Sequence, residues 1–177
     1  GPLTVLDFAS VSPIVAAEIV RNALLAVAAA SVGILMYIAW AFRHVPHPFR
    51  FGTCALVALL HDLLVVAGVF SIAGKVAGTE VDSMFIVALL TVAGYSVHDT
   101  IVVFDRIREN RLKYPAEDFD TIVNLSLAET LGRSLTTSLT VVLTMVVLLL
   151  YGGVTIREFV WALLIGVVSG TYSSIFN

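Results

Sequence analysis

Five long apolar stretches constrain this chain more than any other feature of its sequence. Three of them, 23–42, 135–151 and 159–176, contain no Asp, Glu, Lys or Arg, and the other two, 51–72 and 84–104, each hold one His-Asp pair. Each stretch is long enough, or nearly so, to cross about 30 Å of hydrocarbon as a helix, and unpaired backbone groups exclude open strands from lipid. We therefore expect an all-α membrane protein with five transmembrane helices. The predicted spans are about 20–42, 51–72, 83–104, 130–151 and 157–176.

The composition agrees with a lipid environment and excludes several other classes of protein. Charged residues make up 13% of the chain, about half the share typical of soluble domains. The net charge of −3 argues against a nucleic-acid-binding domain, and the single cysteine allows neither an internal disulfide nor a cysteine-based zinc site. No catalytic motif or metal-ligand cluster is visible. We therefore expect no enzyme and no metal or other cofactor, so that any work must draw on an ion gradient or a partner.

Basic residues are concentrated in two of the predicted loops, 43–50 and 105–133. Seven of the ten Lys and Arg residues lie there: Arg43, Arg50, Arg106, Arg108, Arg111, Lys113 and Arg133. The positive-inside rule places both loops in the cytoplasm. The N-terminus is then predicted to lie outside the membrane and the C-terminus inside.

The N-terminal residues predict a short extended segment. Residues 3–11 are mixed in polarity, partly β-branched and closed by Pro13, which is typical of a strand. We expect residues 1–13 to be the end of an external domain and 14–177 to be the transmembrane domain. Because such a chain would start outside the membrane, we also expect an upstream membrane segment to have been removed.

The longest polar loop predicts an additional helix after Pro115. Asp118 is a suitable N-cap, and the following apolar positions fall near one helical face. These positions are Phe119, Ile122, Val123, Ser126 and Leu127. We expect an amphipathic helix on the cytoplasmic surface, with a solvated hairpin as the alternative.

Ionisable residues inside the predicted spans are the strongest functional signal. A central Asp costs about 2.5–3.5 kcal/mol on insertion scales, so such residues normally face the bundle and have partners. Asp99 lies roughly 8 Å from the cytoplasmic end of its span, and Arg133 starts the next span at a similar depth. We predict an Asp99–Arg133 ion pair, in which the arginine favours ionised Asp99 while burial favours its protonation. Those opposed pressures suit a reversible proton carrier, although Arg133 could instead extend to the headgroups.

Several neighbouring residues are candidates for supporting roles. Tyr95 and His98 share a face of the third span, and Thr137 and Thr140 follow Arg133 on the fourth, as a polar relay lining would. The alternative for the hydroxyl groups is bonding to backbone carbonyls one turn back. Asp62 is either a second relay residue or a fixed hydrogen-bond acceptor, and the histidines either shuttle protons or are structural. The remaining candidates, for close helix packing, are Gly94, Gly166 and Gly170.

The third span carries a recognisable motif, GYSVHDTIVVFDRIREN (94–110). It closely resembles the signature of SecF, the smaller half of the bacterial SecDF protein-export factor. Four other segments resemble that family in the same order along the chain. They are VSPIVAAEIV (11–20), ALVALLHDLLVVAG (55–68), ETLGRSLTTSLT (129–140) and LIGVVSGTYSSIF (164–176).

The resemblance implies half of an RND-type transporter, in which six spans are usual and an external domain separates the first two. We expect this sequence to start at the end of that domain. It departs from the family at His98, where Asn is usual, and at Ser12, where Gly is common. The resemblance further implies that Asp99 and Arg133 take part in proton flow across the bacterial cytoplasmic membrane, with Asp62 in a less defined role. The implied partners are SecD, the SecYEG channel, YajC and the translocating preprotein. Two other functions remain open: another RND-type exporter of lipids or small molecules, and a passive scaffold that binds the translocon.

Overall fold

The computed structural model describes residues 13–43, 48–79 and 81–176. These residues form five long helices and one short 3-10 turn, in the order α1, α2, α3, α4, η1, α5. Their bounds are Pro13–Ala41, Pro48–Ala77, Ser83–Lys113, Phe119–Tyr151, Val154–Ile156 and Arg157–Phe176. The five helices are each long and apolar enough to cross a membrane, which confirms the predicted all-α fold with five apolar helices. The strand predicted at 3–11 lies outside the described residues.

Local sequence signals explain where the helices begin and end. Both α1 and α2 begin at a proline, whose fixed φ suits the first helical position. Asp82 caps α3 by accepting from the backbone N–H of Phe85 at 3.0 Å. Beyond the end of α2, Gly78 has φ +70°, a conformation that favours glycine.

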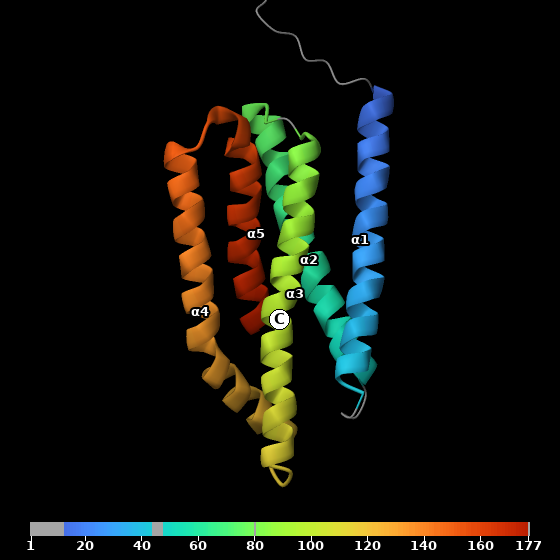
Figure 1. The fold of residues 1–177 in the computed structure, drawn as a ribbon, viewed down its shortest axis with the longest axis vertical. Coiled ribbons are helices and arrows are strands. Elements are labelled where there is room, and N and C mark those ends of the chain that lie inside the picture. The colour runs from blue at the N-terminus through green and yellow to red at the C-terminus, as the bar shows by residue number, and fades with distance from the viewer. Residues whose placement is uncertain (1–12, 44–47, 80, 177) are drawn as a thin grey trace, which may run out of the picture.

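Helix α3 stands in the middle of the bundle and contacts each of the other four helices (Figure 1). Helix α5 lies between α3 and α4 and also packs against α2, whereas α1 stands at the edge and contacts α2 and α3. The largest apolar core is built by α2, α3 and α5, and includes Leu59, Val66, Val92 and Ala162. The ribbon of α3 continues well past the end of α5, so α5 ends beside the middle of α3 (Figure 1).

Glycines allow α5 to approach α3 closely. A Cβ at Gly166 would collide with the side chain of Val92, and one at Gly170 would touch Ser96 Cβ at 3.4 Å. Both positions agree with close packing of small residues. Gly94 differs, because it is exposed and a Cβ there would meet nothing within 4 Å.

The residues after Pro115 form the beginning of α4. Asp118 is the N-cap, as predicted, and accepts from the backbone N–H of Asp120 at 3.0 Å. The segment is not a separate surface helix: it continues into α4, and its first turns incline toward α3 (Figure 1). Ile122 is buried there with Val103 and Ile107 of α3. The predicted apolar face exists, but it packs on the extended end of α3.

Candidate functional site

Asp62 lies on α2 and is completely buried, with an exposed fraction of 0%. Its Oδ2 accepts hydrogen bonds from Ser96 at 2.6 Å and from Ser173 at 2.7 Å, and its Oδ1 accepts one from Ser169 at 2.8 Å. The Nδ1 atom of the adjacent His61, whose side chain is 41% exposed, lies 3.1 Å from Oδ1. Asp62 therefore joins α2 to α3 and α5, and each of its oxygens has two polar neighbours.

Asp99 lies on α3 and is 6% exposed. Its Oδ1 accepts from Ser134 of α4 at 3.0 Å, and its Oδ2 accepts from Ser174 of α5 at 3.1 Å. Each oxygen thus has one hydroxyl donor. The contacts are longer and fewer than those of Asp62, so Asp99 keeps acceptor capacity that Asp62 has already used.

The predicted ion pair between Asp99 and Arg133 is not formed. Arg133 is exposed, and the ion pairs of the described residues do not include it. The residue that reaches Asp99 from α4 is Ser134, one position later and therefore about 100° around the helix. Arg133 instead lines a cleft of about 690 Å³ with Trp40 and Asp105, among others. Similar depth in the membrane correctly predicted that this part of α4 lies near Asp99. It did not predict which α4 side chain points toward Asp99, because depth does not specify the rotation of the helix.

The inward face of α4 is a row of small hydroxyl residues at four-residue spacing. Its buried polar members are Ser126, Thr130, Ser134 and Ser138. Ser138 Oγ lies 2.8 Å from the Tyr95 hydroxyl and 2.6 Å from Thr171 Oγ1, so it connects α3, α4 and α5. The predicted polar stripe, which begins at Arg133 and Thr137, lies one residue earlier on α4. Thr130, Ser134 and Ser138 were not among the predicted site residues, although their four-residue spacing was a readable signal.

The other predicted lining residues point away from the buried network. Thr137 and Thr140 are exposed, and Thr140 donates to the carbonyl of Thr136 one turn back at 2.9 Å, as the alternative interpretation expected. His98 is exposed beside buried Asp99. Within the described part of the chain, the predicted lining residue whose side chain is hydrogen-bonded to a neighbouring helix is Tyr95.

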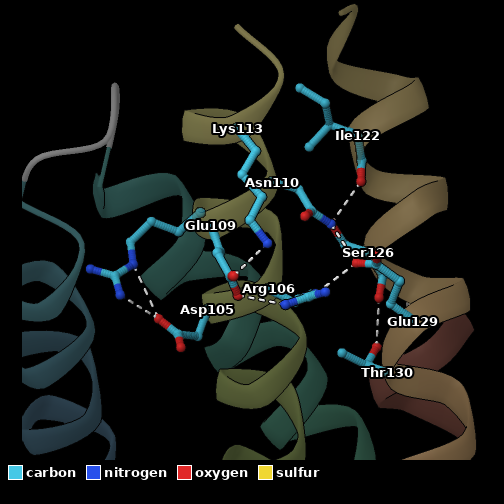
Figure 2. Close-up of polar contacts among 10 residues, drawn as sticks. Asp105, Arg106, Glu109, Asn110, Lys113, Ile122, Ser126, Glu129 and Thr130 are labelled. Atoms are coloured by element: carbon cyan, nitrogen blue, oxygen red, sulfur yellow. Dashed lines mark hydrogen bonds and ion pairs between the residues drawn. The ribbon is translucent and has the colours of Figure 1, made fainter.

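A second polar cluster lies beyond the apolar part of α3, where α3 and the first turns of α4 meet (Figure 2). Arg106 donates to Glu109 and to Glu129 at 2.6 Å each, and Lys113 lies 2.8 Å from Glu109. Asn110 is buried and donates to Ser126 at 3.0 Å and to Glu129 at 2.7 Å. We call these six residues the ionic cluster. Unlike the buried aspartates, its carboxylates face full positive charges.

The charges of the ionic cluster shift its ionisation equilibria. Hydrogen bonds from Lys113 and Arg106 hold the pKa of Glu109 below its usual value. The pKa of Glu129 is lowered by hydrogen bonds from Arg106 and Asn110. Both carboxylates are therefore held in the ionised form at neutral pH. The buried Oδ1 atom of Asn110 has no hydrogen-bond partner among the described residues.

Among the described residues, the hydrogen-bond partners of the two buried carboxylates are hydroxyls, together with the half-exposed imidazole of His61 beside Asp62. In the part of the chain that the structure describes, no three His, Cys, Asp or Glu residues form a group suited to a metal ion. Carboxylates among hydroxyl groups can exchange protons and hydrogen bonds. Membrane-length helices enclosing such a polar network define a multi-pass α-helical membrane protein.

The family of this chain follows from comparison with known proteins. Residues 2–177 match the family described as "Protein export membrane protein SecD/SecF, C-terminal". The chain belongs to this family. It is 61% identical over 172 residues to the protein translocase subunit SecF of Thermobaculum terrenum, covering 97% of this chain and 54% of that protein. It is 49% identical over 175 residues to the SecF of Anaerolinea thermophila, covering 98% and 57%.

A solved structure agrees with this assignment. The fold resembles the crystal structure of SecDF in its super-membrane-facing form, with a TM-score of 0.80 and 39% sequence identity. The match covers 94% of this chain and 21% of that one. The chain thus spans slightly more than half the length of the SecF relatives and about a fifth of SecDF.

Proposed function

We propose that this chain is the membrane-embedded part of a SecF-type translocase subunit that uses the proton-motive force to promote protein export. Its relatives are named as protein translocase subunits, and the family is described as one of export membrane proteins. A proton crossing about 100 mV releases about 2.3 kcal/mol, which is a sufficient energy source for a conformational cycle. The protein would lie in the bacterial cytoplasmic membrane, with its N-terminal side outside and its C-terminus in the cytoplasm.

The observation that carries this proposal is the environment of Asp99. The carboxylate is buried where three helices meet, and its hydrogen-bond partners are two neutral hydroxyls, Ser134 and Ser174. Burial disfavours a charged carboxylate, whereas the two donors stabilise one. A carboxylate under these opposed influences is suited to gain and lose a proton as its access to water changes.

Arg133 is proposed as the mobile counter-charge of Asp99. Arg133 immediately precedes Ser134 on α4, and Ser134 donates a hydrogen bond to Asp99. The long side chain of Arg133 and its place on the wall of an open cleft allow it to approach the carboxylate if α4 turns about its axis. The relay then alternates between hydroxyl-bound and arginine-bound forms of Asp99, with His98 available at the exposed side.

One of the proposed partners is supported by a relative. The structural match to SecDF supports a SecD half as the direct partner. We further propose that the assembled subunit acts with the SecYEG channel and YajC on the emerging preprotein.

The direct test is preprotein export into proteoliposomes that contain the full-length subunit, its SecD partner and the translocon. We expect Asp99→Asn to insert and assemble normally but to lose the export that depends on a proton gradient. Thr140→Ala, an exposed change on α4, is the matched control and should export normally. Full proton-dependent export by Asp99→Asn would refute the relay.

A double-mutant cycle tests the role given to Arg133. Asp99→Asn and Arg133→Gln should each reduce the proton-dependent export rate, and the double variant should be little worse than either single variant. Additive losses would show that the two residues act separately. Export of hydrophobic compounds by vesicles without a translocon would favour a lipid or small-molecule exporter instead.

A further inference from the structure

Two adjacent serines near the end of α5 contact two different carboxylates. Ser173 donates to Asp62 Oδ2 at 2.7 Å, and Ser174 donates to Asp99 Oδ2 at 3.1 Å. Successive helical residues point about 100° apart, so each serine faces a different neighbour. One turn of α5 is therefore bonded to both buried acids at once.

The hydroxyls of Ser173 and Ser174 differ in how strongly their distances favour the carboxylate over the helix carbonyl. Each has a single hydrogen and two acceptors within reach, one of them a carbonyl of α5 itself. For Ser173 the carboxylate of Asp62 is much the nearer, at 2.7 Å against 3.3 Å to the Gly170 carbonyl. For Ser174 the acceptors are nearly equidistant, at 3.1 Å to Asp99 and 3.0 Å to the Thr171 carbonyl. The Ser174 hydroxyl can thus donate either to α3 or to its own helix, with no preference in distance.

The Asp62 end of this arrangement is also the more strongly held. Asp62 binds α5 a second time through Ser169 at 2.8 Å and binds α3 through Ser96 at 2.6 Å. Asp99 has one donor on each oxygen, Ser174 from α5 and Ser134 from α4. A change of charge at Asp99 therefore alters one bond to α5 and leaves the three bonds to Asp62 in place.

We propose that Ser174 is the positioning residue through which the protonation state of Asp99 sets the position of the end of α5, with Asp62 as the fixed point. An ionised Asp99 is the stronger acceptor and draws the Ser174 hydrogen to α3. A protonated Asp99 is the weaker acceptor, so the hydrogen turns to the Thr171 carbonyl and this end of α5 is released. The inference rests on the proposed function, because it requires Asp99 to exchange a proton.

Few other ionisable groups surround this site. On α2 they are Asp62 and the half-exposed His61, on α3 the half-buried Tyr95 and the exposed His98, and on α4 the exposed Arg133. The last three turns of α5 carry only Tyr172, which is exposed, and the described ionisable side chains of α1 are exposed as well. Asp99 is thus the buried ionisable group that Ser174 contacts directly.

The test measures the position of α5 against pH. The full-length protein with its SecD partner carries spin labels at Cys54 on α2, which is exposed, and at Tyr172→Cys on α5. We expect the distance distribution from pulsed EPR to differ between neutral pH and the acid end of a pH series. Asp99→Asn should hold the low-pH distribution at both values. Ser174→Ala should abolish the shift, and Ser174→Thr, which keeps the hydroxyl, should restore it.

Ser173→Ala is the matched control, because it removes the neighbouring hydroxyl and its contact with Asp62. It should change the distribution at both pH values and keep the shift, whereas loss of the shift would overturn the assignment of Asp62 as the fixed point. A normal shift in Ser174→Ala would overturn the proposal, even if Asp99→Asn still abolished proton-dependent export. Normal export by Asp99→Asn would instead refute the proposed function on which it rests. A hydrogen bond to a charged group shifts an equilibrium by roughly tenfold or more, so these outcomes are resolvable.

Discussion

The chain handles its acidic residues in opposite ways in two regions. In the ionic cluster, Glu109 and Glu129 face Arg106 and Lys113, and every one of these groups is partly exposed to solvent. Inside the bundle, Asp62 and Asp99 are buried and meet chiefly serine hydroxyls. In the first region opposite charges cancel, whereas in the second a neutral donor stabilises a charge without cancelling it. The two regions therefore differ in what stabilises a carboxylate, which is full positive charge in the ionic cluster and neutral hydroxyl donors inside the bundle.

The comparison also predicts where stability resides. Exposed ion pairs contribute little, because water and salt screen them and the long side chains lose entropy. Buried hydroxyls that lose their acceptor are costly, because no water replaces it. Substitutions in the two regions should accordingly differ in their effect on unfolding far more than the number of charges would suggest.

The largest effect is expected for Asp62→Ala. It leaves the buried hydroxyls of Ser96, Ser169 and Ser173 without their carboxylate. Among the described residues, a second acceptor is within reach of Ser173 alone, the Gly170 carbonyl at 3.3 Å. We expect a loss of about 2–5 kcal/mol in the free energy of unfolding, measured by denaturant titration in detergent micelles. Asp62→Asn keeps the volume and one acceptor and should lose less. An Asp62→Ala variant as stable as its parent would break the comparison.

An intermediate effect is expected at Asn110, a buried member of the ionic cluster. Asn110→Ala loses two hydrogen bonds, to Ser126 and Glu129, but also removes the Oδ1 atom that has no described partner. We expect a net loss of about 1 kcal/mol in the same unfolding assay. Asn110→Asp is the informative control, because it places a second carboxylate against Glu129. It should be less stable than Asn110→Ala at neutral pH, and a more stable Asp variant would show that Glu129 is not held in place.

Much of the fold was predictable, because a long apolar stretch with few or no charged residues nearly always forms a membrane helix. The extensions of α3 to Lys113 and of α4 back to Phe119 were underestimated, because the criterion was the absence of charge. A helix can continue beyond the lipid where its side chains find other partners. Ile107 near the end of α3 packs against Ile122 near the start of α4, which gives these two polar helix ends an apolar contact. The amphipathic pattern was therefore correct, but its partner was a helix and not the membrane surface.

The sequence was sufficient to predict the two acidic residues of the candidate site, but not the residues that form hydrogen bonds with them. A buried Asp is rare enough to be noticed alone, and both Asp62 and Asp99 are indeed buried. Arg133 was paired with Asp99 because both were rare and equally deep, yet the structure selects the neighbouring Ser134. Serine is common in membrane helices and usually bonds to its own backbone, so its role depends on helix rotation, which a single sequence does not specify.

The smallest effect is expected for the double change Glu109→Gln with Glu129→Gln. Folding lowers the pKa of both carboxylates below the ordinary value of 4.5, so the folded chain binds fewer protons than the unfolded chain in acid. The stability that they contribute is complete above about pH 4.5 and is lost as the pH falls through the lower folded values. We expect the double variant to melt close to its parent at neutral pH in high salt, and to lose part of the parent's acid sensitivity. A fall in Tm as large as that of Asp62→Ala would mean that the ionic cluster is not solvent-screened, and the contrast between charge pairs outside the bundle and hydroxyl-held acids inside it would no longer hold.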